Sequence, residues 1–274
     1  MDVVRRAVTP IRVVAVRDGR RLEKPDVLAT EEPMEVRAHG PGQQPVAVAV
    51  TLRTPGHDFD LAVGFLHGEG LLLPGEVATV CYCEQVEKAD QAYNIVTVAL
   101  RRPFVPPPAR AFAATAACGV CGKTSLDEVA ARCDPVAPGP VVDADLLARL
   151  PDRLRAGQAV FERTGGLHGA GLFSADGDVL CVREDIGRHN AVDKVVGWAL
   201  LAGRLPLSGT ILVVSGRLGF EIVQKAAMAG IGLVGAVSAP SSLAAATAER
   251  LGVTLAGFIR GRSMNLYTHP GRVP

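Results

Sequence analysis

Two cysteines on one glycine-rich segment carry the sharpest chemical signal in the sequence. Cys118 and Cys121 are spaced C-x-x-C, glycine follows each of them, and Lys123 lies close by. Ser125 and Glu128 have the S-x-x-E spacing of a capping box, which predicts a helix over residues 125–132. Thiols placed before a helix start and beside a lysine have a lowered pKa. A thiolate can accept a sulfur atom, hold it as a persulfide and transfer it, so the spacing favours thiol chemistry.

The same pair also allows a zinc site. His67 and Glu69 form H-x-E, and together with C-x-x-C this is similar to the nucleobase deaminase signature, in which one histidine and two cysteines hold zinc and the glutamate moves protons. Ala117 stands where that signature has proline, and His67 is predicted to end a helix instead of opening one. A third interpretation is that two small residues are buried in a turn. Spacing alone leaves thiol chemistry and zinc open.

The first hundred residues predict mixed α and β structure. Residues 45–52 alternate and are rich in valine, which is typical of a strand. Residues 58–66 have apolar side chains at helical spacing, and residues 77–83 and 94–100 predict two more strands. Four prolines in residues 101–110 exclude a helix or a central strand there and predict a connection between two parts of the fold.

From residue 166 onward, strands and helices alternate. Asp176 and Gly177 separate two short apolar runs, which predicts a hairpin. The later strands are apolar on both faces, as in a parallel sheet covered by helices, so we expect an α/β layer. The expected order is helix 189–201, strand 210–215, helix 219–229, strand 232–238, helix 241–251 and strand 253–258.

The segments that leave these strands are rich in Gly, Ser, Arg, Asp, His and Asn. Ligands of open parallel sheets bind beyond the carboxyl ends of the strands, and helix N-termini there favour anions. We therefore expect a rim that binds a phosphate-bearing ligand, although loops of this kind are often rich in glycine and serine for structural reasons alone. The segments are residues 184–190, 215–219, 238–242 and 258–263.

Composition excludes several classes of protein. The 29 Lys and Arg nearly balance the 28 Asp and Glu, which argues against unspecific nucleic-acid binding. Hydrophobic residues make up 48% of the 274 residues, enough for a sizeable core and too many for a disordered chain. No apolar run is long enough to span a membrane, and the first residues lack the apolar core of a secretory signal. We therefore expect a cytoplasmic protein.

Taken together, the motifs make the family recognisable. The sequence resembles the FdhD family, the sulfur carrier proteins needed for formate dehydrogenase activity, from about residue 29 to residue 272. The matching stretches are EEPMEVR at 31–37, TPGHD at 54–58, CGVCGK at 118–123, TGGLH at 164–168, EDIGRHNAVDK at 184–194, SGR at 215–217 and FIRGR at 258–262.

The resemblance implies a fold similar to that of cytidine deaminases. We expect a C-terminal α/β domain over residues 111–274, with a mostly parallel sheet, that carries the C-x-x-C loop and the rim. A smaller mixed α+β part is expected over residues 29–110, and residues 1–28 are expected to be a tail or an added strand. Such a fold explains the partial deaminase signature without requiring zinc, and no permanent metal is expected.

The resemblance also implies a function. The family takes sulfur from a cysteine desulfurase as a persulfide and transfers it to the molybdenum cofactor, a bis(molybdopterin guanine dinucleotide), before the cofactor enters formate dehydrogenase. Cys118 would carry the persulfide, with Cys121 as its companion, and the protein would form a homodimer. Asp185 is expected either to accept from the guanine or to cap the helix that follows. The cofactor segment would be Phe258, Ile259, Arg260, Gly261, Arg262 and Ser263.

Two other functions remain open from the residues themselves. One is a zinc-dependent deaminase-like hydrolase that uses His67, Glu69, Cys118 and Cys121. The other is a non-enzymatic chaperone that binds the cofactor and passes it to the dehydrogenase.

Overall fold

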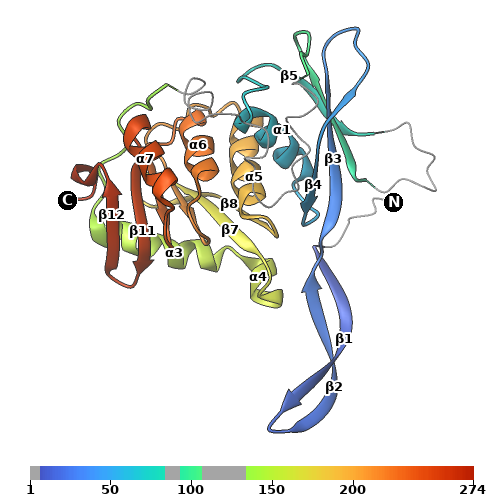
Figure 1. Ribbon diagram of the computed structural model, residues 1–274, viewed down its shortest axis with the longest axis vertical. Coiled ribbons are helices and arrows are strands. Elements are labelled where there is room, and N and C mark those ends of the chain that lie inside the picture. Colours follow the sequence, from blue (N-terminus) through green and yellow to red (C-terminus); the bar gives the residue numbers. More distant parts are fainter. Residues whose placement is uncertain (1–6, 84–92, 107–133) are drawn as a thin grey trace.

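The computed structural model describes residues 7–83, 93–106 and 134–274, arranged around three sheets (Figure 1). The two cysteines at 118 and 121 and the helix expected over residues 125–132 lie outside the described residues. No helix in the described ranges combines the length and the apolar character needed to cross a membrane.

A hairpin projects from the body near the amino end. Its strands β1 (Val8–Arg17) and β2 (Arg20–Ala29) pair antiparallel and only with each other. The turn residues Asp18 and Gly19 have φ values of 49° and 76°, as the tight two-residue turn between twisted strands requires. Figure 1 shows the turn end of this hairpin, called the arm below, projecting away from the rest of the molecule.

A four-stranded sheet follows the arm, in the order β4-β3-β6-β5. The three strands expected in this region are confirmed, whereas β3 lies on a stretch in which the sequence analysis saw only a motif. Helix α1 (Asp58–Gly68) packs its apolar residues against this sheet and confirms the helix expected over residues 58–66. The strands are β3 (Glu32–His39), β4 (Val46–Arg53), β5 (Val77–Tyr82) and β6 (Ile95–Leu100).

The second half of the chain forms a six-stranded sheet in the order β12-β11-β10-β9-β7-β8, which confirms the α/β class. β9, β10 and β11 are parallel neighbours, while β7 and β12 run in the opposite direction, so the sheet is mixed. The predicted hairpin at Gly177 joins β7 to β8. The strands are β7 (His168–Phe173), β8 (Val179–Asp185), β9 (Ile211–Val214), β10 (Leu233–Ala236), β11 (Thr254–Arg260) and β12 (Ser263–Thr268).

Helices cover both faces of this sheet. The three expected helices are confirmed as α5 (Arg188–Leu201), α6 (Phe220–Met228) and α7 (Ser242–Leu251), which bury one face. On the other face lies α3 (Ala144–Ala156), which the sequence analysis did not predict. The short helix α4 (Ala159–Thr164) and the 3-10 turn η1 (Pro270–Arg272) complete the structure.

Two glycines join the halves of the molecule. Gly64 of α1 and Gly197 of α5 lie where the two helices touch backbone to backbone. A Cβ at residue 64 would overlap the carbonyl oxygen of Asp193, and one at residue 197 would overlap that of Asp60. Only glycine allows this approach, so the α1–α5 contact fixes how the small sheet sits on the large one.

Candidate functional site

The four segments expected to form the rim lie along one edge of the large sheet. Ser215 bonds Gly169 twice, through its backbone N–H at 2.9 Å and its Oγ at 2.9 Å, which places the end of β9 beside the start of β7. Further along, the Leu218 N–H donates to the carbonyl of Ala239 at 3.1 Å, and the Phe258 N–H donates to the carbonyl of Ser238 at 3.1 Å. Residues 184–190, 215–219, 238–242 and 258–263 therefore form one continuous surface from β8 to β11, called the ledge below.

One end of the ledge is electropositive. His168, at the start of β7, has a lowered pKa, first because it is half-buried and next because Arg188, His189 and Arg217 surround it with positive charge. Because the ordinary pKa of histidine is about 6.5, a histidine whose pKa is lowered is mostly neutral at pH 7. A neutral imidazole among arginines suits hydrogen bonding to an anion at this end of the ledge.

Beside these arginines lies a carboxylate with unused bonding capacity. The Oε2 of Glu221, on the first turn of α6, is 2.8 Å from the Nε2 of His189, on the first turn of α5. The Oε1 of Glu221 and the Nε of Arg188 are both buried, and neither has a hydrogen-bond partner among the residues that the structure describes. Buried polar atoms normally have partners, so these two atoms mark the ledge as a place where a polar ligand fits.

Asp185 fills a structural role, so the guanine contact suggested by the sequence is wrong. Its side chain is fully buried and its Oδ2 lies 2.7 Å from the Nζ of Lys194, itself only 1% exposed. Oδ2 accepts from the Thr54 N–H at 3.1 Å, and Oδ1 accepts from the Gly187 N–H at 2.8 Å and from Asn190 at 3.0 Å. The carboxylate thus ties β8, α5 and the 54–58 segment together. It does not cap the helix as the alternative expected: the N-cap of α5 is Gly187, and Asp185 accepts from the N–H of that residue and from the Asn190 side chain instead of from the N–H groups of the first turn.

Residues 258–263 form the hairpin at the far end of the ledge. Phe258 has φ 53° and is 41% exposed, whereas Ile259 is fully buried. Arg260 pairs with Ser263 across the turn at Gly261, and Arg260 is exposed. Arg262 is also exposed, and its Nη2 lies 2.8 Å from Asp145. The cofactor role expected for these six residues stays a prediction. The hairpin presents Phe258 and Arg260 to a ligand and keeps Ile259 in the core.

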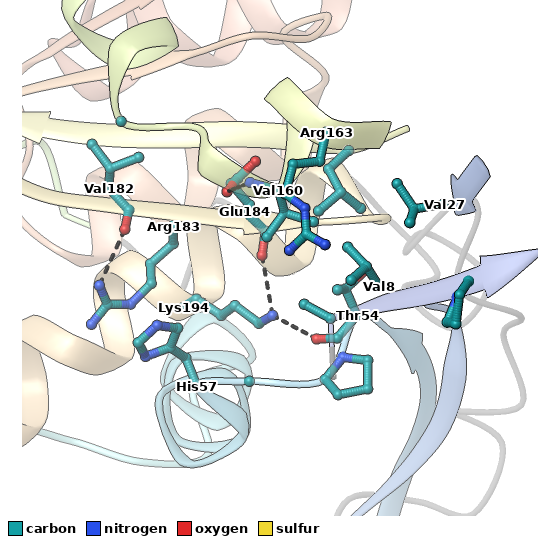
Figure 2. A pocket seen from close by; sticks show the side chains of 16 residues that line it. Val8, Val27, Thr54, His57, Val160, Arg163, Val182, Arg183, Glu184 and Lys194 are labelled. Carbon is teal, nitrogen blue, oxygen red and sulfur yellow. Dashed lines mark hydrogen bonds between the residues drawn. The ribbon is translucent and has the colours of Figure 1, made fainter. Parts of the chain in front are cut away.

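A cavity of about 720 Å³ adjoins the ledge where β8 ends. It lies between β8, α4, the 54–57 segment and the base of the arm (Figure 2). Its apolar wall includes Val8, Val27 and Val182. Two charged groups of the lining already bond the backbone. Glu184 accepts from two N–H groups of α4, and Lys194 donates to the carbonyls of Thr54 at 2.9 Å and Glu184 at 3.2 Å. A volume of this size suits a small ligand.

His57 stands at this cavity in a strained conformation. Its φ of 57° is rare for a residue other than glycine. Burial and the positive charge of Arg183 lower the pKa of its imidazole. Thr54, His57 and Lys194 lie in motifs that the sequence analysis used only for the resemblance. Their part in the site was missed because contacts between residues 140 positions apart leave no periodic signal in the sequence.

The thiol chemistry predicted for Cys118 and Cys121 stays a prediction, because both residues lie outside the described ranges. Among the described cysteines, Cys181 is buried, and burial raises its pKa to about 11. A thiol of this kind is inert at neutral pH. Cys81 is exposed and Cys83 is partly exposed, so burial does not exclude these two thiols, and only the C-x-x-C spacing favours Cys118 and Cys121 as the sulfur carriers.

Both ring nitrogens of the histidine required by the zinc interpretation already have hydrogen-bond partners. His67 is 3% exposed, its Nδ1 lies 2.9 Å from the carbonyl oxygen of Leu72, and its Nε2 lies 3.2 Å from that of Met228. Neither ring nitrogen is directed at an open site. Within the described ranges, no group of three or more His, Cys, Asp or Glu side chains is arranged to hold a metal ion.

Comparison with known proteins decides the family. The model of the FdhD/NarQ family matches residues 29–274. The chain belongs to the FdhD/NarQ family. Two family members named sulfur carrier protein FdhD illustrate the similarity. The protein of Nocardia farcinica is 52% identical over 266 residues, which covers 96% of this chain and 93% of that protein. The protein of Mycobacterium tuberculosis is 50% identical over 263 residues, or 92% and 93% of the two chains.

A solved structure supports the fold of this FdhD/NarQ chain. The crystal structure of a putative formate dehydrogenase accessory protein from Desulfotalea psychrophila superposes with a TM-score of 0.74 at 23% sequence identity. It covers 98% of this chain and 100% of the other. At that identity the likeness establishes the fold alone.

Proposed function

We propose that this protein is a sulfur carrier that serves the maturation of formate dehydrogenase. The observation that carries the proposal is the identity of about half of all residues, over nearly the whole chain, with proteins named as FdhD sulfur carriers. Sulfur transfer needs a reactive thiol and a place for the acceptor. Cys118 and Cys121 supply the thiols in the sequence. Binding of an anionic acceptor to the ledge is supported by the exposed Arg260 and by the Nε of Arg188, which has no hydrogen-bond partner among the described residues.

In this proposal sulfur moves by thiol–persulfide exchange. The Cys118 thiolate attacks the outer sulfur of a cysteine desulfurase persulfide, the S–S bond of the donor breaks, and the donor leaves as a thiolate. Cys118 then carries the sulfane sulfur. Cys121 can release it by attacking the inner sulfur of Cys118, which forms a Cys118–Cys121 disulfide and frees hydrosulfide. That disulfide needs two electrons from an external reductant before the next cycle.

The acceptor in this proposal is the bis(molybdopterin guanine dinucleotide) cofactor, bound before it enters formate dehydrogenase. Its phosphates are anionic, and Arg260 on the 258–263 hairpin and Arg217 at the end of β9 both lie on the ledge. Arginine binds phosphate with two parallel hydrogen bonds. The same ledge would serve a chaperone that carries the cofactor, so the two roles are compatible.

The sulfur-carrier chemistry is tested by intact mass. The purified protein is incubated with a cysteine desulfurase and cysteine, and its mass is measured before and after reductant. We expect a gain of one sulfur atom that reductant removes and that Cys118→Ala abolishes. Cys181→Ala is the matched control and should gain sulfur normally, because its thiol is buried. Absence of the gain in the wild type, or its retention in Cys118→Ala, contradicts the proposal.

The binding surface is tested with guanosine diphosphate as the probe. We expect Arg260→Ala to weaken binding about tenfold or more in calorimetry, since one charge-assisted contact is worth about 1.5–3 kcal/mol. Arg20→Ala, at the tip of the arm, is the control and should bind like the wild type. Equal affinity in all three proteins would remove residues 258–263 from the proposed cofactor site.

A further inference from the structure

The cavity of about 720 Å³ beside β8 lies between the arm and the body of the protein. At the base of the arm, the Thr30 N–H donates to the carbonyl of Ala7 at 3.0 Å and joins the two strands there. The segment after α4 packs against the same base, since a Cβ at Gly166 would lie 3.4 Å from the Cβ of Ala29. The cavity therefore has one wall on the arm and another on the body.

Much of the lining is aliphatic. Val8 and Val27 belong to the two strands of the arm, Val160 belongs to α4, and Val182 belongs to β8 (Figure 2). Leu167, which is 4% exposed, adds a fifth aliphatic side chain. A concave surface of aliphatic side chains from three parts of the fold binds the hydrocarbon part of a ligand, because water leaves both apolar surfaces when they meet.

Three of the four charged side chains in the lining already have partners within the protein. The Nζ of Lys194 lies 2.7 Å from Asp185, and the Nη2 of Arg183 lies 3.0 Å from Asp60. The two oxygens of Glu184 accept from two N–H groups at the start of α4, at 2.9 Å and 2.7 Å. The charges of these three side chains are therefore stabilised without a ligand.

Arg163, in the last turn of α4, is the fourth charged side chain. It is exposed, and it forms no hydrogen bond or ion pair with any residue that the structure describes. Figure 2 shows its guanidinium group directed in among the other lining side chains. His57 also lines the cavity, and because burial and Arg183 lower its pKa, its imidazole is mostly neutral at pH 7. The described lining therefore presents one unpaired positive charge beside an aliphatic surface.

We propose that this cavity binds a small amphipathic anion, a monocarboxylate with an aliphatic chain. The carboxylate pairs with Arg163, whose guanidinium group can donate two parallel hydrogen bonds to it, and the chain lies against the valines of the arm, α4 and β8. One negative charge matches the one unpaired cation, whereas the phosphates of a nucleotide would bring several negative charges close to Glu184. Arg217 and Arg260, which serve the cofactor in the proposed function, do not line the cavity, so the two proposals are independent.

Octanoate and octanamide give a matched pair of probes, because they share a hydrocarbon chain and differ in charge. Calorimetry on the full chain should show octanoate bound at one site per chain, and Arg163→Gln should weaken it roughly fivefold to tenfold while leaving octanamide unchanged. Arg149→Gln is the control, since Arg149 is an exposed arginine of α3 outside the cavity, and it should bind octanoate like the wild type. Hexanoate should bind about tenfold more weakly than octanoate, because each buried CH₂ contributes about fourfold.

A larger side chain inside the cavity locates the site. Val160→Phe takes up part of the space and should weaken octanoate and octanamide alike, whereas Val105→Phe, at a position 75% exposed and outside the cavity, should weaken neither. A wild type that does not bind octanoate, or equal octanoate affinity of the wild type and Arg163→Gln, overturns the inference. Displacement of octanoate by guanosine diphosphate also overturns it, because the cavity would then belong to the nucleotide. Sulfur loading is read separately by mass, so failure of one proposal leaves the other standing.

Discussion

At the residue scale, burial sorts the ionisable groups into structural and available ones. Asp185 and Lys194 are buried together, and their polar atoms bond other groups of the protein. Glu221, by contrast, has a buried oxygen beside His189 to which no group in the described part of the chain donates. Breaking a buried pair leaves an uncompensated charge, whereas an unused acceptor is available to a ligand. Burial likewise distinguishes the buried Cys181 from the exposed Cys81.

The buried thiol of Cys181 gives a pH-dependent prediction. With a pKa of about 11 only about one part in a thousand of the group is thiolate at pH 8, since each pH unit changes the ratio tenfold. Iodoacetamide at pH 8 should therefore leave Cys181 unlabelled while it labels the exposed Cys81. Labelling of Cys181 should rise only as the pH approaches 11. Peptide mass spectrometry checks this, and equal labelling of both cysteines at pH 8 would contradict the burial.

At the element scale, the α1–α5 contact connects the small sheet to the large sheet. The glycines at 64 and 197 let the helices approach closely enough for α1 to serve both the small sheet and α5. The spacing of apolar residues predicts both helices but not their contact, because a glycine inside a helix indicates only a cost in helix propensity. Which glycine meets a neighbouring backbone is decided by how the two helices cross.

Gly64→Ala tests this joint. The added Cβ would overlap a backbone oxygen, which cannot move aside as a flexible side chain would, so the helices must separate. We expect a loss of about 2–4 kcal/mol in the free energy of unfolding, measured in urea, despite the better helix propensity of alanine. Gly219→Ala is the control, because a Cβ there meets nothing within 4 Å. Equal stability of the two variants would show that the helices do not touch in solution.

At the scale of the whole molecule, the two sheets are tied by polar and apolar contacts. Lys194 donates to the carbonyl of Thr54, Asp185 accepts from the N–H of the same residue, and Leu200 of α5 belongs to the core of the small sheet. Bonds of this kind make one half unstable without the other. The ledge and the cavity beside it depend on both halves.

A single unfolding transition is the expected consequence. Trp198, the only tryptophan, lies on α5, so its fluorescence reports on the large sheet and its helices. Far-ultraviolet circular dichroism reports on every helix and strand. The two signals should give coincident curves in urea, the mark of a cooperative unit. A second transition seen only in circular dichroism would mean that the small sheet unfolds independently.

Most local elements and the family could be predicted from the amino-acid sequence. Alternation, helical spacing and proline clusters act over a few residues, so they predicted α1, β4–β6 and the alternating elements from β7 to β11. The arm and α3 were missed. β1 and β2 carry apolar residues on both faces and therefore show no clean alternation, and α3 follows a proline-rich stretch and holds Pro151.

Which polar residues remain available to a ligand depends on contacts between distant parts of the chain. Asp185 and Glu221 are both acidic residues near a rim segment, and nothing in their local sequence tells them apart. The oxygens of Asp185 are already bonded, because Thr54 and Lys194 converge on them from distant parts of the chain. Glu221 Oε1, in contrast, meets no donor within residues 7–83, 93–106 and 134–274. Hydrogen bonds and charges act over a few ångströms in space, whatever the separation along the chain. The assignment of roles therefore belongs to the fold.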